Sequence, residues 1–202
     1  MKKVVSYVLV GLCSLIFLIL SFLLVTDNLN NFDSTIYQKV VYHNDYFTLL
    51  FNGITEFGDA IILIMLTLLF LLVVKDRKYG FLIAINLILS FLIGNLVKLF
   101  FLRDRPVENV LIEAPWSSFP SSHSLVSTAF YGLLIYFAYK KINNKLLKII
   151  IIFALSLLVL LIMYSRVYLG AHYVSDVIGG FSLGIVFLVI FIDKFVSKMI
   201  DK

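Results

Sequence analysis

The stretch Val4–Val25 reads VVSYVLVGLCSLIFLILSFLLV and contains no charged residue. It is long enough to cross a membrane, because a helix needs roughly 20 apolar residues to span a hydrocarbon core about 30 Å thick. Lys2 and Lys3 precede it, as basic residues precede a secretory signal. The apolar run of a signal is only about 7–15 residues long, and the polar Thr26-Asp27-Asn28 that ends this stretch offers no cleavage site. The stretch therefore predicts a membrane helix that is kept.

Apolar runs of similar length recur along the chain. Hydrophobic residues make up 61% of its 202 residues and charged residues 14%, whereas soluble domains are about 45–50% apolar. The remaining runs are Gly58–Val74, Tyr79–Leu102, Ser122–Tyr139, Leu146–Tyr164 and His172–Ile192. The expected fold is all-α, a single membrane-embedded domain over residues 1–202 with about six transmembrane helices. Cys13 is the single cysteine, so no intramolecular disulfide is possible.

The basic residues alternate between loops, so the net charge of +5 does not indicate a nucleic-acid partner. One side of a six-span arrangement carries Lys2, Lys3, Lys75, Arg77, Lys78, Lys140, Lys141, Lys145, Lys148, Lys194, Lys198 and Lys202. The positive-inside rule makes this side cytoplasmic, with both termini. The other side, expected to face outward from the cell membrane, carries Lys39, Lys98, Arg103, Arg105 and Arg166.

The long outer loop, residues 26–57, has two interpretations. Phe32, Ile36 and Val40 recur at close to helical spacing, which is typical of a helix lying in the membrane interface. Asn30, Asn31 and Asn44 interrupt the pattern, which favours an ordinary loop anchored by aromatic residues.

Three polar segments fall at the outer ends of the predicted spans. In the first, Lys98 and Arg105 are seven residues apart, about two helical turns. They project from one helix face if the helix continues to Pro106, whose ring restricts the residue before it. Taken alone, they are equally typical of basic side chains that reach toward lipid headgroups.

The second segment, Pro120-Ser121-Ser122-His123, comes directly before the fourth span. Serines there are typical of a helix N-cap, and free backbone N–H groups in the first turn favour phosphate. In the third segment His172 and Asp176 are four residues apart. On a helix they share a face, so Asp176 can accept a hydrogen bond from one imidazole nitrogen and leave the other as a nucleophile. The alternative is a structural His–Asp pair between helices.

The three segments meet on one side of the membrane, with two of the chain's 3 histidines. Such a cluster suits phosphoryl transfer, since cations and N–H donors stabilise the charge on the transferred group. Lys98, Arg105 and Arg166 are expected to bind the phosphoryl oxygens. Ser121 and the backbone N–H groups around Ser122 and His123 are expected to be further donors. His172 is the expected nucleophile, and His123 the acid that protonates the leaving oxygen. No clustered metal ligands are evident in the sequence, so neither a metal nor a cofactor is expected.

The chain resembles the type 2 phosphatidic acid phosphatase superfamily, and in particular its small six-span bacterial members. The family pattern of Lys, six residues and Arg-Pro matches Lys98–Pro106. Its Pro-Ser-Gly-His corresponds to Pro120–His123, and its Ser-Arg, five residues, His, three residues and Asp matches Ser165–Asp176. The resemblance implies a metal-independent lipid phosphatase, with His172 as nucleophile, His123 as acid and Asp176 as the group that orients His172.

The chain departs from the family pattern at Ser122, which stands in place of the glycine. Because φ is normally negative in a first helical turn, we expect Ser122 to be tolerated. The resemblance favours phosphatidylglycerophosphate or undecaprenyl pyrophosphate as the lipid phosphate substrate.

Three other functions are alternatives to a lipid phosphatase. One is a lipid phosphotransferase with the same site, and a second is a non-enzymatic protein that binds or transports a lipid phosphate. The third is a vanadate-dependent haloperoxidase, whose relatives are soluble, unlike this apolar chain. Gly180 and Gly184 permit close helix packing within one chain or between two, so the oligomeric state stays open.

Overall fold

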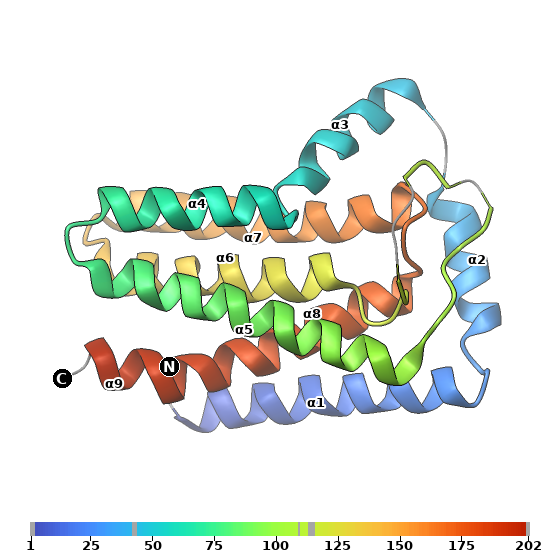
Figure 1. Ribbon diagram of the computed structural model, residues 1–202, viewed down its shortest axis with the longest axis horizontal. Coiled ribbons are helices and arrows are strands. Elements are labelled where there is room, and N and C mark those ends of the chain that lie inside the picture. The colour runs from blue at the N-terminus through green and yellow to red at the C-terminus, as the bar shows by residue number, and fades with distance from the viewer. Residues whose placement is uncertain (1–2, 42–43, 109, 113–115, 201–202) are drawn as a thin grey trace.

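The protein is a bundle of helices in a computed structural model that describes residues 3–41, 44–108, 110–112 and 116–200. No strand occurs in these ranges, and Lys2 and Lys202 of the predicted cytoplasmic set lie outside them. In chain order the helices are α1 (Lys3–Val25), α2 (Asn30–Val40), α3 (Asp45–Glu56), α4 (Ala60–Val73), α5 (Arg77–Phe101), α6 (Ser122–Lys141), α7 (Lys145–Tyr168), α8 (Val174–Phe191), a π-helical turn (Ile192–Val196) and α9 (Ser197–Ile200). The all-α prediction is confirmed (Figure 1).

Four helical segments are long and apolar enough to cross a membrane: Val4–Val25, Arg77–Phe101, Lys145–Tyr168 and Val174–Met199. The pair α3 and α4 makes a fifth if it counts as one span bent by 48°. The expected count of six is therefore not confirmed. The helix that is missing from this set, α6, begins with a run of serine, histidine and threonine residues that lowers its hydropathy. Whether it forms a sixth span stays a prediction.

The centre of the bundle is α6, which packs against α5, α7 and α8 (Figure 1). Its polar residues Ser124, Ser127 and Thr128 avoid lipid because they are buried among the neighbouring helices. The approach of α8 is close: a Cβ on Gly180 would lie 2.4 Å from the Ser121 carbonyl oxygen, and one on Gly184 would lie 2.8 Å from the Leu125 carbonyl oxygen. These glycines thus serve packing within the chain.

The predicted outer loop contains the two helices α2 and α3, so the helical spacing was the correct signal there. In Figure 1, α2 stands at one end of the bundle, beside the segments that join α5 to α6 and α7 to α8. The first residues of α1 and the short α9 lie at the opposite end, on the same side as each other.

Two of the predicted boundaries bear on the polar segments. The third span ends at Phe101 instead of continuing toward Pro106, because Leu102 adopts the left-handed conformation with φ 45°. The last span begins at Val174, so His172 precedes the helix instead of starting it. Lys98 and Arg105 therefore do not share a helix, and neither do His172 and Asp176. Both expectations of a common helix face were wrong.

Candidate active site

The loop between α7 and α8 holds His172 in place. Gly170 takes a φ of 75° after the last turn of α7, and the chain folds back on itself there. The backbone N–H groups of Ala171 and His172 both donate to the Arg166 carbonyl oxygen, at 3.1 Å each. His172 is consequently fixed by its own main chain and is 2% exposed.

The two ring nitrogens of His172 face different partners. Nε2 lies 3.3 Å from Nη1 of Arg105, and Nδ1 lies 3.2 Å from the Ser118 hydroxyl. Because a guanidinium can only donate, Nε2 is the acceptor and Nδ1 carries the proton. Burial lowers the pKa of His172 to about 3, against the opposing effect of Asp176. The imidazole is thus neutral at physiological pH, with its lone pair directed at a cation.

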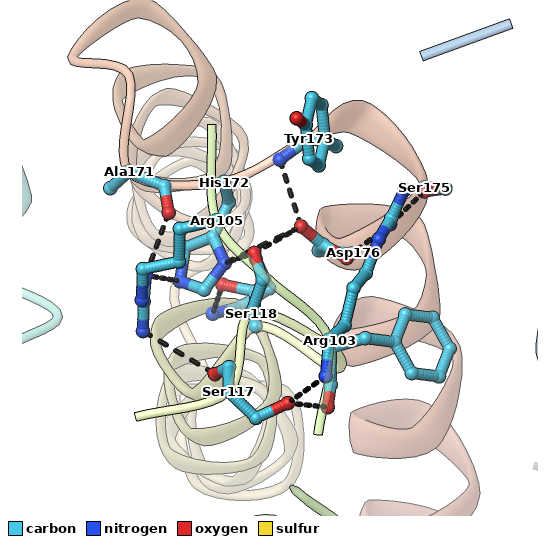
Figure 2. A network of polar contacts seen from close by, with 12 residues as sticks. Arg103, Arg105, Ser117, Ser118, Ala171, His172, Tyr173, Ser175 and Asp176 are labelled. Carbon is cyan, nitrogen blue, oxygen red and sulfur yellow. Dashed lines mark hydrogen bonds and ion pairs between the residues drawn. The ribbon is translucent and has the colours of Figure 1, made fainter. Parts of the chain in front are cut away.

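Asp176 lies next to Nδ1, but the expected direct hydrogen bond is replaced by a bridge. Its Oδ2 is 3.7 Å from Nδ1, and the Ser118 hydroxyl donates to this oxygen at 2.6 Å. The Tyr173 backbone N–H donates to the same oxygen at 2.8 Å. The contacts form a chain from Arg105 through His172 and Ser118 to Asp176 (Figure 2). Ser118 was not among the predicted residues, and a serine in a loop carries no signal that distinguishes it.

Lys98 and Arg105 meet without sharing a helix. The ammonium of Lys98 donates to the Ser117 carbonyl oxygen, and Nη2 of Arg105 reaches the same oxygen at 3.4 Å. Arg105 also donates to the carbonyl oxygens of Ala171, at 2.6 Å, and Trp116, at 3.0 Å. Burial lowers the pKa of Arg105. The two cations thus converge on one carbonyl beside His172.

The remaining predicted residues come from α6 and α7. Arg166 is 4% exposed, and its Nη1 donates to the Thr55 hydroxyl at 2.9 Å. His123 lies in the first turn of α6, within electrostatic range of Arg166, His172, Lys98 and Arg105. The structure brings these predicted side chains into one cluster.

The two serines before His123 differ in their surroundings. Ser121, one of the two serines predicted to cap the helix, is the N-cap of α6: its hydroxyl accepts from the Ser124 N–H at 3.4 Å, and the residue is fully buried. Its own N–H donates to the Asp176 carbonyl oxygen at 3.0 Å, which joins α6 to α8. Ser122 is the first residue of α6, and its hydroxyl lies 3.9 Å from where a Cβ on Gly94 would stand. The side chain thus points toward α5.

An unpredicted ion-pair network continues from Asp176. Arg103 contacts Asp176 at 2.5 Å and Asp33 of α2 at 2.6 Å. An open pocket lies beside this cluster, lined by Leu102, Arg103, Asp104, Arg105, Trp116 and Ser117. Within the described part of the chain, no three histidine, cysteine or acidic side chains are grouped to hold a metal ion.

Known proteins resemble this chain along most of its length. Residues 77–199, which hold all three polar segments, match the PAP2 superfamily. Phosphatidylglycerophosphatase B of Bacillus subtilis is 30% identical over 196 residues, covering 93% of this chain and 96% of the relative. Undecaprenyl-diphosphatase of Sulfolobus acidocaldarius is 31% identical over 157 residues, covering 72% of this chain and 70% of the relative.

Solved structures agree with these matches. The crystal structure of the transmembrane PAP2-type phosphatidylglycerolphosphate phosphatase from Bacillus subtilis superposes with a TM-score of 0.85 at 28% identity, covering 94% of this chain and 96% of that one. LpxE of Aquifex aeolicus shares the fold, with a TM-score of 0.67 at 23% identity over 80% of this chain and 95% of that one. The apolar helices and these membrane relatives make the protein a multi-pass membrane protein. Because the superfamily match spans more than half of the sequence and a curated relative is 30% identical over nearly all of it, the chain belongs to the PAP2 superfamily, the family that its three motifs indicated.

Proposed function

We propose that this protein is a membrane lipid phosphatase that hydrolyses a phosphomonoester or pyrophosphate, with His172 as nucleophile. One observation carries the proposal. The lone pair of Nε2 is aimed at the guanidinium of Arg105, while the protonated Nδ1 faces Ser118 and Asp176. A neutral histidine whose lone pair faces a phosphate-binding cation is arranged for attack on phosphorus.

The phosphoryl group would be held by Lys98, Arg105 and Arg166. Lys98 and Arg105 already share the Ser117 carbonyl oxygen as a partner, which marks a point where negative charge is stabilised. The backbone N–H groups of Ser122 and His123, in the first turn of α6, add donors at the positive end of a helix. Together these groups stabilise the equatorial oxygens of the transition state.

The reaction proceeds in two displacements. Nε2 of His172 forms a bond to phosphorus as the bond to the leaving oxygen breaks, and His123 protonates that oxygen. A water molecule then attacks the phosphohistidine while His123 takes one of its protons. Inorganic phosphate leaves and His172 is restored, so the sum is a phosphate ester and water converted to an alcohol and phosphate. No step uses a metal ion.

Ser122 fits this mechanism in place of the family glycine. The residue is helical, so it needs no positive φ, and its hydroxyl points toward Gly94 on α5. The Cβ therefore takes up space that α5 leaves open, and the backbone N–H stays available.

Phosphatidylglycerophosphate and undecaprenyl pyrophosphate are the substrates we propose, from the names of the relatives. We place the site on the outer face of the membrane, with both termini cytoplasmic. The support is that the site and the described ends of the chain lie at opposite ends of the bundle (Figure 1), and that the basic residues gather in the loops near the termini.

The test is phosphate release by the purified protein in detergent, with EDTA and no lipid acceptor, from a panel that includes both proposed lipids. We expect release from at least one of them, and a loss of at least about 1000-fold in His172→Ala. Undiminished release by this variant would refute the nucleophile, and a collapse with EDTA would refute the metal-independent reaction. Phosphate release only after a lipid acceptor is added would favour the phosphotransferase. Binding of the lipid phosphate without any release would favour the non-enzymatic function.

A further inference from the structure

Arg103 lies in the loop after α5 and joins two buried carboxylates that are far apart in sequence. Its Nη2 contacts Oδ2 of Asp33 at 2.6 Å, and its Nη1 contacts Oδ1 of Asp176 at 2.5 Å. The side chains are 8%, 1% and 0% exposed, for Arg103, Asp33 and Asp176 respectively. One guanidinium thus connects α2, at the outer end of the bundle, to the carboxylate next to His172.

Asp33 also holds the beginning of α8. Its Oδ1 accepts from the Ser175 backbone N–H at 3.0 Å, and its Oδ2 accepts from the Ser175 hydroxyl at 2.5 Å. Nη1 of Arg103 donates to the same hydroxyl at 2.7 Å, and the guanidinium stands 4.6 Å from the centre of the Tyr173 ring. Ser175, the residue directly before Asp176, therefore sits in a turn whose position depends on α2.

The charges explain why this arrangement needs an arginine. Two carboxylates buried close together repel each other, and each is costly to bury unless it is paired. A planar guanidinium presents separate N–H groups to both, which a lysine cannot do with one ammonium. Burial lowers the pKa of Arg103, but Asp176 and Asp33 more than offset this and raise it, so the side chain stays charged.

The main chain of Arg103 also contacts Ser117 and Ser118, the two serines beside His172. Its carbonyl oxygen accepts from the Ser118 N–H at 2.8 Å, and its N–H donates to the Ser117 hydroxyl at 2.9 Å. Ser118 is the residue whose hydroxyl lies between His172 and Asp176. Figure 2 shows Arg103 and Ser118 reaching Asp176 from different directions.

We propose that Arg103 is a positioning residue for the phosphatase reaction, held by Asp33, which keeps Asp176 ionised and oriented so that His172 presents the lone pair of Nε2. The inference rests on the proposed function and extends it to two residues that the family pattern does not specify: Arg103, one of the six unspecified residues between Lys98 and Arg105, and Asp33, which lies before the first motif. Arg103 acts through Asp176 and does not bind the phosphoryl group.

The kinetics of phosphate release separate this role from a structural one. The substrate is a short-chain phosphatidic acid in detergent micelles, or a proposed lipid that the protein hydrolyses. For Arg103→Met we expect kcat to fall roughly 10- to 100-fold with KM within about 3-fold, since a charge-assisted contact to Asp176 is lost. Arg103→Lys should recover part of kcat. Asp33→Asn should lose less than Arg103→Met, and Lys39→Met, which removes an exposed cation of α2, should match the parent.

The decisive comparison repeats Arg103→Met in an Asp176→Asn background. If Arg103 acts through Asp176, the second substitution lowers the remaining kcat by less than about 3-fold. An equal fold loss in both backgrounds, or a loss confined to KM, would overturn the proposal. Thermal melting in detergent identifies variants that fail to fold. If Arg103→Met fails to fold, Arg103→Lys and Asp33→Asn are each compared with and without Asp176→Asn instead.

A measurement without substrate separates this proposal from the proposed function. The ring ¹⁵N resonances of His172 report which nitrogen carries the proton. We expect the Nδ1-protonated form in the parent and a mixture of tautomers in Arg103→Lys and Arg103→Met. If the parent releases no phosphate, the proposed function fails while this comparison still decides the role of Arg103. An unchanged tautomer in both variants would refute that role.

Discussion

Removing the Ser118 hydroxyl tests how His172 is held. This hydroxyl lies 3.2 Å from Nδ1 of His172 and 2.6 Å from Oδ2 of Asp176, whereas those two atoms are 3.7 Å apart. In Ser118→Ala the proton on Nδ1 loses its nearest acceptor, and one oxygen of Asp176 loses a donor. Ser118 is fully buried, so water does not easily take the place of the hydroxyl.

The size of the effect follows from these contacts. A hydrogen bond to a charged group contributes about 1.5–3 kcal/mol, and 1.4 kcal/mol is a factor of ten in rate. If the whole contribution is made in the transition state, when His172 becomes positively polarised, kcat falls roughly 10- to 100-fold. Direct closure of the 3.7 Å gap between His172 and Asp176 would recover part of this loss. We therefore expect a decrease of about 10-fold, with KM nearly unchanged.

The assay is the initial rate of phosphate release from a lipid phosphate in detergent micelles, measured across substrate concentrations. Ser124→Ala is the matched control. Ser124 is also a fully buried serine near the start of α6, but its hydroxyl has no hydrogen-bond partner among the described residues. The control should keep the parent's kcat and KM, because the hydroxyl that it removes makes no hydrogen bond to any described residue.

Two results would refute the reasoning. A kcat within 2-fold of the parent in Ser118→Ala would mean that His172 and Asp176 interact directly and that the serine bridge is not used. An increase in KM with unchanged kcat would mean that Ser118 contributes to binding of the ground state and not to the reaction.

Three further predictions follow from other parts of the structure. Gly180→Ala should destabilise the protein by about 1–3 kcal/mol, because the new Cβ would press on the Ser121 carbonyl oxygen. Thermal melting in detergent should show a lower Tm for this variant than for the control Gly53→Ala, whose new Cβ would have no other atom within 4 Å. The ring of His172 should stay neutral from pH 8 to pH 5, since its pKa is about 3, and an NMR titration midpoint near the ordinary value of 6.5 would contradict this. Tyr37→Phe removes the 2.6 Å hydrogen bond to the Glu108 carbonyl oxygen and should lower stability by about 1 kcal/mol, and an unchanged melting temperature would show that this contact is not stabilising.

The apolar helices were predictable because a bilayer imposes a length and a composition on any segment that crosses it. The run Val4–Val25 needed no knowledge of its neighbours to be identified. The helix α6 shows the limit of this signal, because its first turns contain Ser122, His123 and Ser124. A buried helix is shielded from lipid by other helices, so its hydropathy reflects what surrounds it and not the membrane alone.

The candidate cluster was predictable as a set, but its geometry was not. The prediction placed Lys98 and Arg105 on one helix face, and they meet because Leu102 turns the chain out of the helix. No residue type in that stretch signals a left-handed turn at leucine. Asp33 lies in the predicted outer loop, where nothing in the local sequence indicates that it is buried. Its partner Arg103 is 70 residues away in the chain, and a local pattern does not contain such a contact.

The charge of the cluster bears on the kind of phosphate that fits it. More cations than carboxylates form or adjoin the contacts around His172, so the group has an excess of positive charge. The cations are Lys98, Arg103, Arg105 and Arg166, and the carboxylates are Asp33, Asp176 and Asp59, the last of which acts on Arg166. Charges of one sign held together out of water are costly unless an opposite charge joins them. A terminal phosphate carries nearly two negative charges at neutral pH and a phosphodiester carries one, so the terminal phosphate is attracted more strongly to this excess. The cluster should therefore favour lipids that end in a phosphate or pyrophosphate over diesters of the same lipid.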